Sequence, residues 1–138
     1  RGDDIRKFEE IGTHPVANRL AISEALTLHN GIGPRRKEAR LRYLRDRWAK
    51  RLMQDKRFKL YSRLDPRHSC GIGTFAVKEI DSAKLVEHLW NKHRIITTPI
   101  DSAQIVGVRI TPNIYTTLDE IDMFCEAMEN VLANGLPA

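Results

Sequence analysis

The arginine in the segment IVGVRIT has surroundings that favour binding chemistry. Arg109 lies between Val108 and Ile110 in a run of β-forming residues, so its side chain projects to the face opposite theirs, near the end of the predicted strand. A guanidinium held there can bind a planar carboxylate through two parallel hydrogen bonds. The pattern leaves a second interpretation open, in which Arg109 is an edge arginine that faces water.

A second candidate site lies at the start of the first predicted helix. Gly12 and Thr13 precede this helix. The free backbone N–H groups of a helix start, together with a hydroxyl, can hold a phosphate or another anion. The same residue types also occur in an ordinary helix cap, so both interpretations stand.

The sequence contains no motif for self-sufficient catalysis. It has no phosphate-binding glycine-rich loop ahead of a helix, no HExxH, no paired CxxC and no GxSxG. The run GIGTF at Gly71 lies in a predicted strand, where glycines favour close packing or a bulge. His88 and His93 stand near a helix end, which favours solvated roles over metal binding. We therefore expect no metal site.

Length and composition bound the class of protein. With 138 residues, 41% of them hydrophobic, the chain suits one core. No apolar run approaches the roughly 20 residues of a membrane-spanning helix. Cys70 and Cys125 have apolar surroundings and no metal-ligand spacing, which predicts buried free thiols and a reducing, cytoplasmic compartment. The chain begins at Arg1 without a secretory signal, so we expect a fragment of a longer protein.

The positive charge is concentrated in one segment. Residues 35–63 hold thirteen Lys and Arg against three acids, whereas the net charge of the whole chain is +5. This basic patch supports an alternative function, a nucleic-acid-binding module. Against it, Trp48 belongs to an apolar helix stripe, and only Tyr43 and Tyr61 remain to stack on bases. Arginines around such a stripe are also typical of a solvated amphipathic helix.

Apolar periodicity predicts four helices. In chain order they span residues 15–28, 34–54, 81–93 and 117–134. Thr13 or His14 would cap the first helix, with Pro15 in its first turn, and Asn30-Gly31 would end it. Residues 117–120 form a capping box, and Asn134-Gly135 ends the last helix.

Each of the last three helices has a predicted apolar stripe. The second helix carries its arginines on the other faces. The stripes consist of Leu41, Leu44, Trp48 and Leu52; of Leu85, Val86, Leu89 and Trp90; and of Ile121, Phe124, Cys125, Met128 and Leu132.

Four strands are predicted, over residues 57–61, 71–80, 94–98 and 105–110, with the turn-prone PIDSAQ between the last two. In the first, Phe58 and Leu60 alternate with Lys59 and Tyr61. The element order indicates an α+β domain, a small mostly antiparallel sheet of three or four strands covered by helices on one face. A crossover over residues 71–98 would leave two strands parallel, so a mixed sheet is an open alternative.

Three runs together resemble a known family. They are KFEEIGTHPVAN (residues 7–18), GIGPRRKEARLRYLRDRWAKRL (31–52) and VRITPNIYTTLDEIDMF (108–124). In order and spacing they resemble the C-terminal part of class V aminotransferases, which are fold-type I pyridoxal-phosphate (PLP) enzymes, and above all the isopenicillin-N-epimerase-like branch. The resemblance covers nearly the whole chain.

The resemblance implies a small C-terminal domain over residues 15–138, joined by residues 1–14 to a PLP-binding large domain that this chain lacks. It implies an aminotransferase or epimerase-like enzyme that acts on an amino acid as a homodimer. In similar proteins the threonine of the Gly-Thr pair reaches the cofactor phosphate of the partner subunit, which matches Gly12 and Thr13. The arginine of the VRI strand grips the substrate α-carboxylate, which matches Arg109.

The chain also departs from the complete enzymes. Their Schiff-base lysine belongs to the large domain, so we expect the 138 residues alone neither to hold PLP tightly nor to turn over an amino acid. Related cysteine desulfurases carry a catalytic cysteine before the arginine strand, whereas PIDSAQ has none. A catalytically silent interaction domain is a further possibility.

Overall fold

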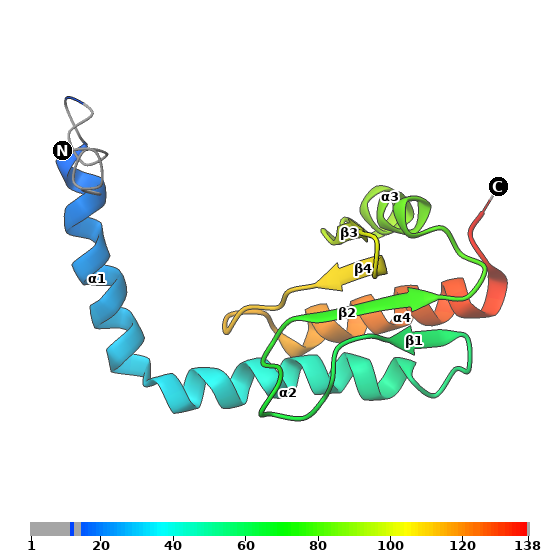
Figure 1. The fold of residues 1–138 in the computed structure, drawn as a ribbon, viewed down its shortest axis with the longest axis horizontal. Coiled ribbons are helices and arrows are strands. Elements are labelled where there is room, and N and C mark those ends of the chain that lie inside the picture. The colour runs from blue at the N-terminus through cyan, green and yellow to red at the C-terminus, as the bar shows by residue number, and fades with distance from the viewer. Residues whose placement is uncertain (1–11, 13–14, 138) are drawn as a thin grey trace. The chain divides into compact units, whose positions relative to one another are not determined.

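Helix α1 (Val16–Ile32) is the main element of the first of two units into which the chain divides, residues 1–34 and 35–138. The computed structural model describes Gly12 and residues 15–137. Figure 1 draws α1 as the blue helix. No residue of α1 is buried, and the side chains of Leu20 and Leu28 are 66% and 65% exposed.

The ends of α1 differ from the prediction. Pro15 is the N-cap residue, so the helix begins one residue later, and Thr13 and His14 lie outside the described residues. The predicted stop at Asn30-Gly31 is wrong, because the helix continues to Ile32. It ends where Gly33 adopts a φ of 88°, which favours glycine, and Pro34 follows.

The second unit consists of three helices and a four-stranded sheet. In chain order its elements are α2 (Pro34–Leu52), β1 (Phe58–Leu60), β2 (Gly73–Val77), α3 (Ser82–His93), β3 (Thr98–Asp101), β4 (Val106–Ile110) and α4 (Leu118–Asn134). All four predicted helices and three of the four predicted strands are present, and a fourth strand lies further along the chain than predicted, which confirms the α+β class.

The strands are ordered β1-β2-β4-β3, and every neighbouring pair is antiparallel. β4 therefore separates β2 from β3, the two strands joined by the α3 crossover. The alternative of a mixed sheet is wrong, because this insertion gives both strands an antiparallel neighbour.

The third strand lies further along the chain than predicted. It covers Thr98–Asp101 and not residues 94–98, so the segment PIDSAQ is half strand and half turn. Pro99 pairs with Val108 on this edge strand. An edge position tolerates proline, because one side of the strand needs no ladder hydrogen bond. Pro99 indicated a turn in the sequence, because proline is common in turns.

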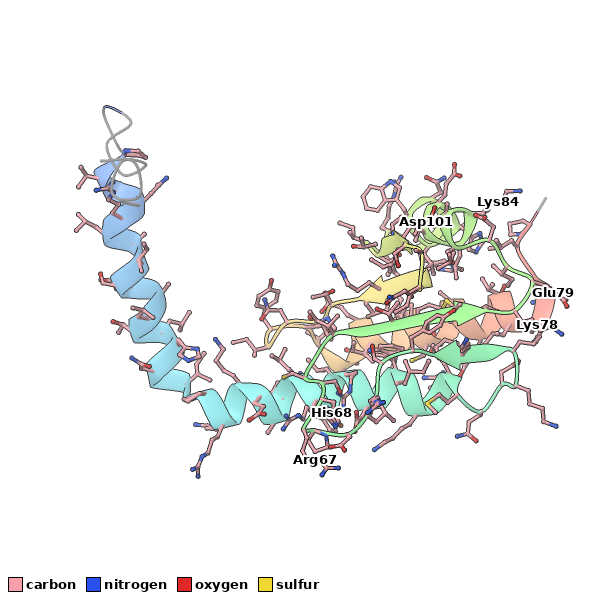
Figure 2. The ribbon with its side chains drawn as sticks, in the orientation of Figure 1. Arg67, His68, Lys78, Glu79, Lys84 and Asp101 are labelled. Carbon is pink, nitrogen blue, oxygen red and sulfur yellow. The ribbon has the colours of Figure 1, made fainter. Side chains whose placement is uncertain are left out.

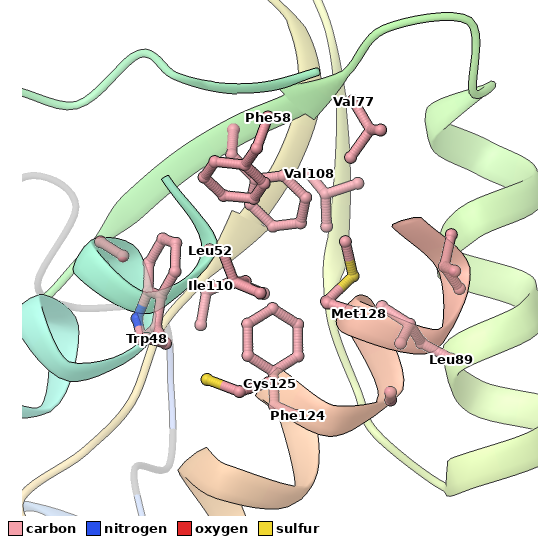
Figure 3. Close-up of a cluster of buried hydrophobic side chains, with 14 of the residues drawn as sticks. Trp48, Leu52, Phe58, Val77, Leu89, Val108, Ile110, Phe124, Cys125 and Met128 are labelled. Atoms are coloured by element: carbon pink, nitrogen blue, oxygen red, sulfur yellow. The ribbon is translucent and has the colours of Figure 1, made fainter. Parts of the chain in front are cut away.

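The core lies between one face of the sheet and the helices (Figure 3). β2 and β4 contribute Phe75, Val77, Val108 and Ile110, and Phe58 comes from β1. The buried helix residues are Leu44, Trp48, Ala49 and Leu52 of α2, Leu85 and Leu89 of α3, and Ile121, Phe124, Cys125, Ala127, Met128, Val131 and Leu132 of α4. Helices thus cover one face of the sheet, as predicted.

Trp48 is the centre of the aromatic part of this core. Its ring centroid lies 6.5 Å from Phe58, 6.0 Å from Phe75 and 5.9 Å from Phe124. The indole also occupies the place of a side chain at Gly73, because a Cβ there would lie 2.5 Å from the Trp48 ring. Glycine at position 73 therefore serves close packing, as the sequence indicated.

The starts of α3 and α4 agree with the predictions. The Asp81 carboxylate accepts a hydrogen bond from the Lys84 N–H, and Thr117 and Glu120 form the reciprocal capping box of α4. The stripe of α4 is entirely buried, whereas in α3 the prediction is wrong for Trp90, which is 44% exposed. Its ring instead packs under the Arg94 guanidinium, 5.1 Å from the centroid.

One arginine of α2 is buried, although the sequence placed the arginines on the faces away from the apolar stripe. Arg45 is 1% exposed. Its guanidinium donates to the Asp46 carboxylate at 2.9 and 2.7 Å, to Ser69 Oγ at 2.5 Å and to the Leu64 carbonyl at 3.1 Å. Nearby, Arg42 donates to the Pro66 carbonyl at 2.6 Å. These bonds anchor the segment between β1 and β2 on α2.

Candidate carboxylate-binding site

Arg109 lies on β4, an inner strand of the sheet, and its side chain is on the face opposite the helices. Its neighbours Val108 and Ile110 are buried in the core, whereas Arg109 is exposed. The predicted orientation is therefore confirmed. Of the alternative, an edge arginine that faces water, only the edge position is wrong, because β3 occupies the edge and Arg109 is exposed.

The neighbours of Arg109 form one row across the open face of the sheet. Arg109 is paired with Thr74 on β2 and with Thr98 on β3. Tyr61 follows β1 and donates its N–H to the Thr74 carbonyl at 2.8 Å, which places it at the far end of the same row. A guanidinium is thus flanked by two threonine hydroxyls and a phenol, all able to donate to a carboxylate.

Beside this row the sheet carries small residues. A Cβ on Gly107 would lie 2.4 Å from the Phe75 carbonyl oxygen and 3.5 Å from Cε2 of Tyr61. The Tyr61 ring therefore leans from β1 across β2 toward β4, and glycine at position 107 is required by the close backbone. The Lys59 ammonium lies 4.6 Å from the centroid of the same ring.

Arg109 differs from Arg42, Arg45, Arg47 and Arg51 of α2, each of which is paired with a carboxylate. Arg47 binds both carboxylate oxygens of Asp122, at 2.8 and 2.6 Å, and Arg51 binds both of Glu129, at 2.6 and 2.7 Å. Within residues 15–137, no carboxylate forms an ion pair with Arg109. Its charge remains available to an external anion.

These ion pairs also bear on the basic patch of residues 35–63. Besides Asp122 and Glu129, the carboxylates of Glu38, Asp46 and Asp55 pair with arginines of this segment. Hydrogen bonding to Arg47 lowers the pKa of Asp122, so this pair stays ionised well into the acid range. These five carboxylates therefore neutralise part of the basic charge within the fold, which weakens the case for a phosphate-binding surface.

The other predicted anion site is only partly described. Gly12 is exposed and has a φ of 98°, in the region that favours glycine, and Thr13 lies outside the described residues. Gly12 belongs to the unit of residues 1–34, whereas Arg109 belongs to the unit of residues 35–138.

The described residues do not form a complete PLP site. Such a site needs a Schiff-base lysine and a partner for the pyridine nitrogen. A hollow of about 620 Å³ adjoins the end of β4, and its lining contains neither lysine nor aspartate. Exposed apolar side chains border this hollow, among them Ile96, which is 82% exposed, and Tyr115, which is 79% exposed.

Two histidines and two cysteines are the remaining candidates that the sequence offered. Burial and the nearby His93 lower the pKa of His88, whose ring lies 5.7 Å from that of His93. Across the described ranges, no group of three or more His, Cys, Asp or Glu side chains is placed to hold a metal ion. Cys125 is a buried free thiol, as predicted, whereas Cys70 is only half buried. No helix in the described part of the chain is long and apolar enough to cross a bilayer.

The sequence identified Arg109 but missed the residues around it. Alternation in residues 57–61 already placed Lys59 and Tyr61 on one face, opposite Phe58 and Leu60. Their approach to Arg109 depends on the strand order, which no local pattern specifies. The threonines could be assigned only once the register was known.

Comparison with known proteins supports the resemblance drawn from the sequence. No protein-family model matches the chain. It is 31% identical over 127 residues to isopenicillin N epimerase of Streptomyces clavuligerus, a match that covers 91% of this chain and 32% of that protein. The chain thus spans about a third of the length of this relative.

The fold agrees with a solved aminotransferase. Alanine–glyoxylate aminotransferase from Nostoc sp. superposes with a TM-score of 0.69 at 20% identity, over 88% of this chain and 32% of that one. This likeness concerns the fold, and it confirms the predicted α+β architecture. Taken with the sequence match, it confirms that the chain resembles the C-terminal domain of class V aminotransferases, in the isopenicillin-N-epimerase-like branch.

Proposed function

We propose that this chain is the part of a PLP-dependent aminotransferase or epimerase-like enzyme that binds the α-carboxylate of an amino-acid substrate through Arg109. The observation that carries the proposal is an arginine on an inner strand, exposed on the uncovered sheet face and flanked by Thr74 and Thr98. A carboxylate there accepts two bonds from the guanidinium and more from the hydroxyls.

The remainder of the active site would come from outside this chain. A large domain would hold PLP and its lysine, and PLP supplies the electron sink for chemistry at the α-carbon. Gly12 and Thr13 would contact the cofactor phosphate in a homodimer. The exposed apolar side chains Trp90, Ile96, Tyr115 and Met123 support a partner domain that covers them. The 138-residue chain alone would be inactive.

The test is a titration of the 138-residue chain with acetate, monitored by NMR of the arginine Nε–Hε groups, against chloride at equal ionic strength. Arg109 should show a saturable shift with acetate, and Arg36, an exposed arginine of α2, should not. Arg109→Met should abolish the acetate-specific shifts of residues on β2 and β3. Equal responses of Arg109 and Arg36 would contradict the proposal.

If the parent enzyme is prepared, Arg109→Ala should raise the KM for the amino acid about tenfold to a thousandfold, because charge-assisted bonds are lost. An unchanged KM would remove Arg109 from the substrate site.

A further inference from the structure

A second cation lies on the same sheet face as Arg109. Lys59 is paired with Ala76 on β2, and the β2–β4 register, continued by one residue, sets Ala76 beside Gly107. Gly107 is paired with Ile100 on β3. Lys59, Ala76, Gly107 and Ile100 therefore form a row across the sheet that lies beside the row of Arg109. Standard strand spacing puts the Cα atoms of Lys59 and Arg109 about 12 Å apart.

The Lys59 side chain is directed toward the centre of the sheet by Tyr61. Its ammonium lies 4.6 Å from the centroid of the Tyr61 ring. That ring in turn leans over Gly107, since its Cε2 is 3.5 Å from the position of a Cβ there. The positive charge is thus held on an aromatic surface that points toward the strand of Arg109.

The Tyr61 ring covers part of the face between the two cations, and the strand positions of this face lack acidic groups. The strand positions that point to it, apart from Lys59 and Arg109, are occupied by Thr74, Ala76, Thr98, Ile100 and Gly107. Among the described residues, no carboxylate forms an ion pair with Lys59. Two unneutralised cations therefore flank a floor of small and neutral residues.

We propose that Lys59, held by Tyr61, forms a subsite for a second anionic group, so that the ligand of this face is an amino acid with a second carboxylate. This inference rests on the proposed function, in which Arg109 binds the α-carboxylate. Lys59 acts as a specificity determinant, because its Cα and that of Arg109 are about 12 Å apart, a spacing that suits two carboxylates joined by a few carbons better than a single carboxylate.

The experiment compares acetate, glutarate and oxalate as ligands of the complete 138-residue chain, by NMR titration at constant ionic strength. Glutarate should bind about three- to fivefold more tightly than acetate, as expected for one added exposed ion pair. Oxalate carries the same charge, but its carboxylates are adjacent, so it should gain less. In Lys59→Met, which keeps the aliphatic stem, glutarate should bind no more tightly than acetate. The matched control is Lys84→Met on α3 (Figure 2), which should preserve the glutarate preference.

The outcomes separate the two proposals. Loss of the glutarate preference in Lys59→Met, with acetate binding unchanged, supports the subsite. A preference that survives in Lys59→Met, or that falls equally in Lys84→Met, overturns it while Arg109 keeps its role. If Arg109→Met binds acetate as the unaltered chain does, the proposed function fails, and the subsite fails with it. Amide spectra of each variant verify that the fold is retained.

Discussion

Thr74 and Arg109 lie directly opposite each other on β2 and β4, on the face of the sheet that the helices leave uncovered. Their residue-by-residue pairing is maintained by core contacts on the other face, where Phe75 and Val108 are adjacent and completely buried. Because side chains alternate along a strand, a slip of one residue would move Arg109 into the core. The apolar residues of the core therefore determine where Arg109 and its neighbours Thr74 and Thr98 lie on the opposite face.

The packing of Gly73 against Trp48 predicts a large effect of one added methyl group. Gly73→Ala should lower the free energy of unfolding by about 1–3 kcal/mol, because the indole cannot retreat from a fully packed core. Urea denaturation followed by Trp fluorescence measures this change. Gly31→Ala is the control, since a Cβ there has nothing within 4 Å. A destabilisation by Gly31→Ala equal to that by Gly73→Ala would refute the steric explanation.

The buried guanidinium of Arg45 predicts that the segment between β1 and β2 depends on one side chain. Arg45→Met should cost about 1.5–3 kcal/mol of stability, since it removes charge-assisted bonds to Asp46, Ser69 and Leu64. Hydrogen exchange should also accelerate for the backbone around Ser69. Arg67→Met is the matched control, because Arg67 lies in the same segment but is 81% exposed in its pair with Asp65 (Figure 2). It should leave the unfolding midpoint unchanged.

The ion pairs between α2 and α4 predict a loss of stability in acid. Hydrogen bonds from Arg47 and Arg51 lower the pKa values of Asp122 and Glu129 below their ordinary values of 3.8 and 4.5. A carboxylate with a lowered folded-state pKa stabilises the fold above its unfolded pKa, and this contribution disappears as the pH falls through the folded value.

The contribution of these two carboxylates to the urea midpoint should therefore be constant from pH 7 to about pH 5 and then fall. In Asp122→Asn/Glu129→Gln the midpoint at neutral pH should be lower and the decline in acid shallower. A double variant with the same slope as the unaltered chain would mean that other carboxylates cause the acid loss.

Burial predicts that Cys125 is chemically inert in the folded chain. Burial raises the pKa of the Cys125 thiol from 9.0 to about 11. Below pH 9 the thiolate fraction is thus about 100-fold lower than for an ordinary thiol, and the sulfur is also shielded. Iodoacetamide labelling at pH 8, followed by mass spectrometry, should modify Cys125 only after denaturation. Rapid native labelling of Cys125 would contradict this, and Cys125→Ser identifies the labelled peptide.

The sequence predicted what local patterns determine and missed what depends on distant pairing. The capping box at Thr117 and the apolar stripe of α4 are local, so that helix was assigned correctly. The predicted position of β3 was wrong because Pro99 is typical of a turn, and only the strand order shows that this strand lies at an edge, where proline is tolerated. For the site, local alternation oriented Arg109, but the approach of Lys59 and Tyr61 requires the strand order.

The position of β4 in the sheet has a consequence for the order of folding. β4 joins β2 to β3, yet among the strands it is the last to leave the ribosome. Before residues 106–110 emerge, β1 and β2 can pair with each other and pack against Trp48 of α2, but β3 has no strand partner. We therefore infer that the sheet of the nascent domain is completed only when its C-terminal quarter has been synthesised, and that the carboxylate site is among the last features to form.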